Sequence, residues 1–166
     1  MHALLLPMAF LSLLLSGAIF GFFYAWVCST MWGLDAADPQ IAIPAMQAMN
    51  ASVRNAVFAP AFFGTPVVLL VTAFLARGGG YPRAALLFGA AGLTYLFGGM
   101  ALTMAINVPM NEALATLSVP SSRDDAAAIW AEYSPRWQLY NVVRTAFSGV
   151  TLLLTGAGLM ALNRAT

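Results

Sequence analysis

Four long stretches of apolar residues, separated by clusters of polar and charged ones, organise the chain. Each stretch reaches the roughly 20 residues that a helix needs to cross the hydrocarbon core of a bilayer. The pattern predicts membrane-spanning helices over residues 4–30, 55–76, 84–106 and 142–162. We therefore expect an all-α fold in which residues 1–166 form a single integral membrane domain, a bundle of four transmembrane helices.

The connections between these spans are unequal. Residues 78–82 read Gly-Gly-Gly-Tyr-Pro, a composition typical of a tight turn. Residues 32–52 and 107–140 are much longer and contain all six acidic residues of the chain. Because an even number of spans separates these two connections, both must lie on the same side of the membrane. The sequence thus predicts two long polar loops on one face of the bundle.

The distribution of arginines predicts which side that is. The opposite face carries Arg77, Arg83 and Arg164 without a single acid, and an excess of basic residues marks the cytoplasmic side of a membrane protein. We expect a multi-pass protein of the bacterial inner membrane, surrounded by the lipid bilayer, with its N- and C-termini in the cytoplasm and its polar loops outside.

Composition supports a membrane protein and excludes a soluble or nucleic-acid-binding one. Hydrophobic residues make up 61% of the chain and charged residues 8%, whereas an ordinary soluble domain has about 45–50% and about 25%. Seven basic and six acidic residues leave a formal net charge of +1. That is too little for a surface that binds nucleic acid, so no such partner is expected.

The scarcity of Cys and His limits metal and cofactor chemistry. The chain has one Cys, Cys28, and one His, His2, which excludes an intrachain disulfide, a thiolate zinc site and an iron–sulfur cluster. Met100 and Met104 are four residues apart and could offer thioethers to copper, but methionine is also common filler in apolar helices. We expect neither a metal site nor a cofactor.

Polar and aromatic side chains recur at helical spacing where the second and fourth spans begin. If a helix extends upstream of the second span, one face of it carries Gln47, Asn50 and Arg54. The corresponding stripe before the fourth span consists of Trp130, Tyr133, Trp137, Asn141 and Arg144. Pro135 suits the first turn of a helix that begins near Ser134, and such a start would take Trp130 and Tyr133 out of register with the rest.

A third polar group lies where the third span ends. Asn107 and Asn111 are four residues apart around Pro109, and Glu112 is the only acid that directly adjoins a span. Arg144 lies about one helical turn inside the fourth apolar stretch, and an ionisable group at that depth usually faces the bundle interior and has a partner. We expect Glu112 to be that partner.

Simpler roles remain open for several of these residues. Single Trp and Tyr residues near a membrane surface commonly anchor a protein there, and Arg54 can equally reach lipid headgroups. Gly17 and Gly21 form a GxxxG pattern that suits close helix packing. Such glycine-rich faces also suit self-association, so a homo-oligomer is an open alternative.

Three sequence stretches carry a resemblance to a known family. They are MQAMNASVRNAVFAPAFFG at residues 46–64, NVPMNEAL at 107–114 and WAEYSPRWQLYNVVR at 130–144. The chain resembles, over nearly its whole length, the anthrone-oxygenase-like family of small four-helix membrane proteins, many of which are known only as a domain of unknown function. The resemblance implies that five residues occupy positions of the family pattern: Asn107, Asn111, Trp137, Asn141 and Arg144.

The family resemblance implies an activity. Characterised members in polyketide pathways oxidise anthrones to anthraquinones with molecular oxygen, without flavin, haem or a recognised metal motif. The resemblance therefore implies an apolar aromatic small molecule and molecular oxygen as partners. An anthrone is acidic at the carbon between its rings, because the resulting enolate is aromatic, and that carbanion can pass an electron to oxygen. The protein would need a base, donors for the enolate oxygen and flat walls.

The residues present can fill these roles. The candidate base is Glu112, with Tyr133 as a second choice, and Arg144 is the candidate cation for the enolate oxygen. The candidate flat walls are Trp137, Trp130 and Phe63. The candidates for substrate binding are Asn50, Arg54, Asn107, Asn111, Trp130, Trp137 and Asn141.

Two other functions remain open at this point. The chain could be a non-catalytic membrane ligand-binding protein or accessory subunit, in which the Arg and Asn groups tie helices together and the mouth of the bundle is filled. It could also be a redox protein that handles a quinone or lipid with a cofactor supplied by a partner. A cavity at the outer ends of the helices, lined by Asn107, Asn111, Asn141 and Arg144, would favour a ligand site.

Overall fold

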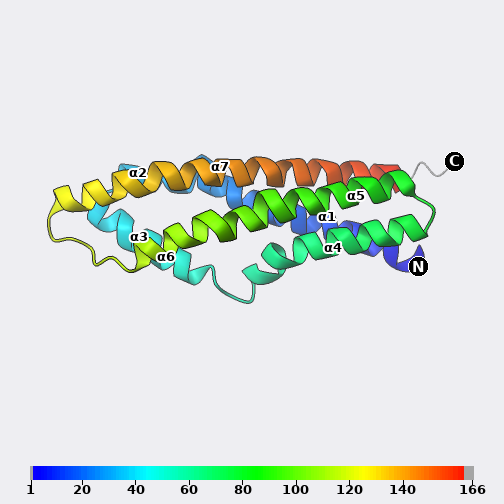
Figure 1. Cartoon of the computed structure of the whole chain (residues 1–166), viewed down its shortest axis with the longest axis horizontal. Coiled ribbons are helices and arrows are strands. Elements are labelled where there is room, and N and C mark those ends of the chain that lie inside the picture. The colour runs from blue at the N-terminus through cyan, green and yellow to red at the C-terminus, as the bar shows by residue number, and fades with distance from the viewer. Residues whose placement is uncertain (1, 163–166) are drawn as a thin grey trace.

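The structure, a computed structural model, describes residues 2–162. All regular secondary structure in this part of the chain is helical (Figure 1). No strand occurs within it. The first helix comprises α1 (His2–Ala25), the π-helical segment η1 (Trp26–Thr30) and α2 (Met31–Ala36). Next come α3 (Pro39–Ser52) and α4 (Phe58–Gly78). The fourth helix comprises α5 (Pro82–Tyr95), η2 (Leu96–Ala101), η3 (Thr103–Asn107) and α6 (Val108–Ala115), and the last is α7 (Arg123–Leu162).

Four of these helices are long and apolar enough to cross a membrane. They are Ala3–Ala36, Phe58–Gly78, Pro82–Ala115 and Arg123–Leu162, which agrees in number with the four expected spans. With 21 residues, α4 is about 32 Å long and matches one hydrocarbon core of about 30 Å. The 40 residues of α7 extend about 60 Å. Three of the helices are therefore longer than one hydrocarbon core, whereas α4 matches it.

The connections predicted to be long polar loops are mostly helical. They contain α2, α3, α6 and the first half of α7, all at the end of the molecule opposite to its first and last described residues (Figure 1). Ala42, Ile43 and Met46 of α3 recur three to four residues apart and bury one face of this helix. That face packs with Leu114 and Trp130 in one hydrophobic cluster. The apolar face explains why a helix forms where a loop was predicted.

The second span begins later than predicted. The helix that carries Gln47 and Asn50 ends at Ser52, and α4 begins at Phe58, so Arg54 does not continue the predicted stripe. The side chain of Asn55 starts α4, because its Oδ1 accepts hydrogen bonds from the backbone N–H groups of Val57 at 2.8 Å and Phe58 at 2.9 Å. Satisfying free N–H groups at a helix start is the usual role of an Asn side chain.

The predicted helix start near Ser134 is wrong, because α7 runs without a break through Pro135. A proline inside a helix removes one backbone hydrogen bond and crowds the preceding turn. Packing offsets this cost here, since Trp130, Tyr133 and Trp137 are all buried in one hydrophobic cluster. These three side chains therefore stay in helical register with Asn141 and Arg144.

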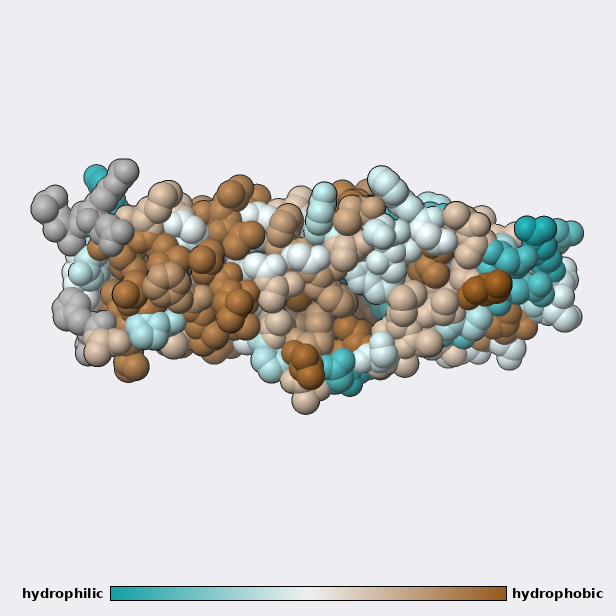
Figure 2. All heavy atoms as spheres, turned by 180° about the vertical axis from the view of Figure 1, so that it is seen from behind, coloured by the Kyte–Doolittle hydropathy of each residue, from teal (hydrophilic) through white to brown (hydrophobic). Residues whose placement is uncertain are grey.

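The half of the molecule that contains α4, here called the spanning half, and the half that contains α2, α3, α6 and the first half of α7, here called the protruding half, have different surfaces. Apolar residues cover most of the half that contains the first and last described residues, whereas polar residues gather at the opposite end (Figure 2). Inside the spanning half, hydroxyl groups join neighbouring helices: Ser12 Oγ lies 2.9 Å from Thr72 Oγ1, and Ser16 Oγ lies 3.4 Å from Thr155 Oγ1. Arg164, which the orientation argument uses, lies outside the described residues.

Candidate functional site

A cavity of about 560 Å³ lies where α4 begins, at the junction of the two halves. The longer helices continue past the start of α4, and the space between them is only partly covered by α3 and residues 53–57. In Figure 2 the surface is hollowed beside the bulge that these residues form. The filled bundle mouth that an accessory subunit would require is thus not present.

Aromatic side chains form a large part of the cavity wall. They come from the first helix and from the first two turns of α4: Phe22, Phe23, Trp26, Phe58, Phe62 and Phe63. Trp137 of α7 adds a further ring, 5.1 Å from the ring of Trp26 between centroids. The predicted roles of Phe63 and Trp137 as wall residues agree with these positions. The rings of the first helix were not predicted, because aromatic residues within an apolar stretch give no distinct signal.

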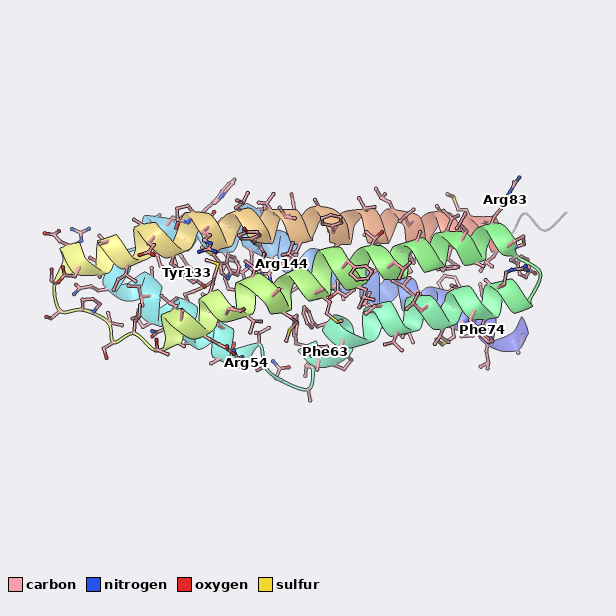
Figure 3. All side chains as sticks on the ribbon, in the orientation of Figure 1. Arg54, Phe63, Phe74, Arg83, Tyr133 and Arg144 are labelled. Atoms are coloured by element: carbon pink, nitrogen blue, oxygen red, sulfur yellow. The ribbon has the colours of Figure 1, made fainter. Side chains whose placement is uncertain are left out.

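Arg144 forms the inner, charged end of the cavity. Arg144 is only 5% exposed, although it lines the cavity. Nε donates to Asn141 Oδ1 at 3.0 Å, and Nη1 donates to Thr103 Oγ1 at 3.3 Å. The guanidinium carbon lies 4.3 Å from the ring centre of Phe23 and 5.0 Å from that of Trp137. Figure 3 shows Arg144 between the helices.

The predicted pairing of Arg144 with Glu112 is wrong. Glu112 Oε1 lies 3.2 Å from Arg54 Nη2, and both side chains are 59% exposed at the cavity rim. Thr103, the partner of Arg144, precedes Glu112 by nine residues on one continuous helix, which separates the two levels by roughly 13 Å. Among the described residues, Arg144 makes no ion pair.

The buried guanidinium is therefore surrounded by neutral groups. A buried cation without an anion loses hydration that dipoles and ring faces restore only in part. Asn141 and Thr103 supply two oxygen dipoles, while Phe23 and Trp137 supply ring faces. An anionic oxygen in the cavity would complete this arrangement, because it would provide the charge that the protein does not.

Asn111 belongs to a group of hydrogen bonds that joins α3, α6 and α7 beside the cavity. Its Oδ1 accepts hydrogen bonds from Tyr133 Oη and from Trp137 Nε1, each at 2.8 Å. Asn50 Nδ2 of α3 donates to Tyr133 Oη at 3.5 Å. Asn50, Asn111 and Trp137 line the cavity, whereas Tyr133 is not among its lining residues. The proposed second base thus lies behind the cavity wall.

Asn107 and Asn141 also stand behind the wall instead of lining the cavity. Asn141 Nδ2 donates to the backbone oxygen of Phe23 at 3.3 Å while its Oδ1 receives Arg144. Asn107 Nδ2 donates to the backbone oxygen of Trp137 at 3.4 Å. Of the four residues expected to line a ligand site, the structure brings Asn111 and Arg144 to the cavity surface.

Trp130 lies outside the cavity and belongs to a separate polar cluster around Asp35. Asp35 Oδ1 accepts from Trp130 Nε1 at 2.9 Å and from Ser134 Oγ at 2.6 Å, and its Oδ2 accepts from Gln138 Nε2 at 2.8 Å. These bonds fasten α2 to α7 in the protruding half. The sequence offered no signal for this cluster, because its partners are about 100 residues apart.

The described residues offer no cluster of three His, Cys, Asp or Glu side chains that could hold a metal ion. The two methionines weighed as thioether ligands also occupy different places. Met104 lines the cavity, whereas Met100 packs against the cluster that contains Ile19 and Tyr95.

Comparison with protein families gives one match. The family model described as "Anthrone oxygenase" matches residues 52–154. This range begins at the end of α3, contains α4 and the whole helix Pro82–Ala115, and ends within α7. It includes Arg54, Asn111, Glu112 and Arg144 but not the aromatic residues of the first helix. No curated protein matches the chain, and no solved structure does.

Proposed function

We propose, on the premise that the chain belongs to the anthrone oxygenase family, that it is a membrane-embedded oxygenase acting on a flat, apolar, anthrone-like aromatic substrate. The observation that carries this proposal is the guanidinium of Arg144, buried at the end of an aromatic cavity without an anionic partner among the described residues. A volume of about 560 Å³ is in the usual range for small-molecule pockets.

Arg144 would stabilise the charge that develops when the substrate loses a proton. Deprotonation at the carbon between the rings moves negative charge to the substrate oxygen, and donors already in place for that charge lower the barrier. Asn141 and Thr103 hold the guanidinium in a fixed orientation. Phe23 and Trp137 cover it with their rings.

Glu112 is the proton acceptor of this proposal. It lines the cavity rim, and its ion pair with Arg54 keeps its carboxylate at that position. Tyr133 fits this role less well, because its hydroxyl donates to Asn111 and lies behind the wall. The base and the oxyanion donor would thus act from opposite ends of the cavity.

The oxidation balances without an electron from the protein. The enolate gives one electron to molecular oxygen, and the resulting radicals couple to form a carbon–oxygen bond at the deprotonated carbon. Protonation gives a hydroperoxide, which loses water. The sum is one anthrone and one oxygen molecule consumed, with one anthraquinone and one water formed. The protein binds, deprotonates and stabilises charge, as its residues allow.

The rim of the cavity favours entry from the bilayer. Phe63 and Met104 on the rim are 51% and 47% exposed. Further along the same helices, Val67 and Phe97 are also exposed apolar residues in the spanning half. A substrate dissolved in lipid could enter along this surface. We also propose that the turn between Arg77 and Arg83 faces the cytoplasm, which places the cavity near the opposite membrane surface.

Two substitutions test the proposed activity in purified protein with an anthrone as substrate and quinone absorbance as readout. Arg144→Ala and Glu112→Gln should each lower turnover about 10²-fold or more, since each removes one charge-handling group. Matched controls on the exposed side of α7, Arg136→Ala and Glu132→Gln, should leave turnover unchanged. Unchanged turnover in Arg144→Ala or Glu112→Gln would remove that residue from the mechanism.

A further inference from the structure

The side chain of Asn111 has a committed oxygen and an uncommitted nitrogen. The indole Nε1 of Trp137 can only donate, so the Asn111 atom 2.8 Å from it must be the oxygen. The hydroxyl of Tyr133 donates to the same oxygen at 2.8 Å. With both donors on Oδ1, the orientation of the amide is fixed and Nδ2 points elsewhere.

Nδ2 of Asn111 has no partner among the described residues and belongs to a side chain that lines the cavity. No hydrogen bond from this nitrogen is recorded to any described residue. The only fully enclosed side-chain polar atom without a partner in the described part of the chain is Asn107 Oδ1. Since Asn111 lines the cavity and its Nδ2 is not enclosed, its two N–H groups are available to an acceptor there.

Asn111 and Arg144 stand on different sides of one indole ring. The edge of Trp137 bonds Asn111 through Nε1, and the guanidinium carbon of Arg144 lies 5.0 Å from its ring centre. Because Nε1 lies about 3 Å from the ring centre, the Asn111 oxygen and the guanidinium carbon are at most about 11 Å apart. The cavity thus has two sets of donors within reach of a single fused aromatic ligand.

We infer that the cavity recognises a planar aromatic ligand with acceptor oxygens on opposite edges, one bound by Arg144 and the other by Asn111 Nδ2. Opposed carbonyl oxygens on a six-membered ring are about 5 Å apart, and a hydrogen bond of about 2.9 Å at each end brings the two donors to about 11 Å. This span lies at the upper limit that the two contacts on Trp137 set, and hydrogen bonds that meet the carbonyl oxygens at an angle shorten it.

This inference rests on the proposed function and deepens it. An anthrone has one such oxygen, and the reaction adds the second on the opposite edge. Substrate would therefore be held at one end and the quinone product at both. The site accordingly favours para-quinone-type ligands over their mono-oxygenated precursors, and Asn111 becomes a residue that determines this specificity.

A substitution at Asn111 separates the donor role from the structural role. Asn111→Asp keeps an oxygen for Tyr133 and Trp137 but removes the N–H donors. Tyr133→Phe is the matched control, because it removes one hydrogen bond to the same oxygen and leaves the N–H groups in place. Binding of anthraquinone, and of anthrone without oxygen present, is measured in lipid nanodiscs by quenching of the fluorescence of Trp26 and Trp137, which line the cavity.

We expect Asn111→Asp to weaken anthraquinone binding about tenfold and anthrone binding by less than about threefold. Tyr133→Phe should change both by less than about threefold. Equal weakening of both ligands, or of neither, in Asn111→Asp would overturn the inference.

The wild-type protein gives a second readout if the variant does not fold. It should bind anthraquinone more tightly than anthrone, and equal affinities would overturn the inference. Turnover is not measured in these assays, so a protein that oxidises anthrone yet binds both ligands equally refutes only the role of Asn111. Absence of binding by either ligand, together with absence of turnover, refutes the proposed function as well.

Discussion

Arg144 shows how single residues in this chain serve more than one purpose. Its hydrogen bonds to Asn141 and Thr103 join α7 to η3, so it holds helices together. Its open side lines the cavity and carries a charge that no described carboxylate neutralises. A purely structural tie of this kind would be cheaper with uncharged partners, because burying a charge is costly. The cavity provides a reason for keeping the charge.

Asp35 is the opposite case, a carboxylate whose partners explain it fully. It accepts hydrogen bonds from Trp130, Ser134 and Gln138 and lies outside the cavity. We predict that Asp35→Ala lowers the free energy of unfolding by about 2–4 kcal/mol, since bonds to a charged acceptor contribute more than neutral ones. Denaturation followed by circular dichroism in detergent measures this change.

The exposed Glu132 provides the control for Asp35. Glu132→Ala, on the exposed side of α7, should stay within about 0.5 kcal/mol of wild type. A loss for Asp35→Ala no larger than that for Glu132→Ala would show that the three hydrogen bonds contribute little to stability.

At this scale the sequence predicted that Arg144 faces inward better than it predicted what Arg144 touches. The depth of Arg144 in an apolar stretch correctly indicated an inward-facing group, because lipid excludes charge. Its partner could not be predicted, since Glu112 and Arg144 come from helices whose relative height depends on the three-dimensional packing. For the same reason the spacing could not show that Asn107 and Asn141 lie behind the wall while Asn111 reaches the cavity.

The helices around the cavity depart from regular α-helical geometry. The π-helical segments η1 and η3 begin at Trp26 and Thr103, and both of these residues line the cavity. A π-helical turn contains one extra residue and shifts the faces of the helix that follow it, a feature frequent at functional sites. In η2, Gly98 and Gly99 face the rings of Phe147 and Tyr95 so closely that a side chain would collide with them.

We predict that Gly98→Ala destabilises the protein by about 1–3 kcal/mol, since an added Cβ would lie 2.2 Å from Phe147 and force η2 and α7 apart. Thermal unfolding followed by circular dichroism measures the effect. Gly156→Ala is the matched helical control, because a Cβ there meets nothing within 4 Å. It should stabilise by up to about 1 kcal/mol through better helix propensity. Equal melting temperatures for the two variants would contradict the close contact.

The spans could be predicted because charge spacing reports on lipid directly, but the extensions beyond them could not. In residues 32–52 and 107–140 the apolar residues are diluted by polar ones, and only the packing of α3 on α6 and α7 reveals the buried face. The continuous helix through Pro135 likewise depends on the packing of Trp130, Tyr133 and Trp137, which a local rule for proline does not include.

The whole molecule is a rod with a lipid-facing half and a protruding half. We propose that α4 marks the position of the bilayer, because its length matches one hydrocarbon core and both of its ends coincide with turns. Arg144 lies 18 residues before the end of α7, roughly 27 Å from it, which on this placement is near one edge of the hydrocarbon core. Figure 3 shows Phe74 and Arg83 near the other end.

Spin labels test this placement. In a Cys28→Ser background, we predict that a label at Phe74→Cys is relaxed more by oxygen than by a water-soluble nickel chelate, because oxygen concentrates in acyl chains. A label at Ile41→Cys should show the reverse, although Ile41 is an exposed apolar residue, because α3 lies in the protruding half. Greater oxygen accessibility at Ile41 would place α3 in the membrane.

The same background tests orientation in intact cells. A membrane-impermeant maleimide should label Ile41→Cys directly and Gly78→Cys only after permeabilisation, since the turn after α4 is proposed to face the cytoplasm. The opposite pattern of labelling would reverse the proposed orientation.

If the substrate enters past the apolar part of the rim, Phe63 and Met104, as proposed, the bilayer is the solvent of the reaction. For a reactant that reaches the protein by diffusion in two dimensions, the relevant concentration is the number of reactant molecules per lipid molecule. At a fixed total amount of reactant, additional empty lipid dilutes it and lowers the rate, even though the volume of water is unchanged. Rates for this protein therefore need to be expressed per membrane area.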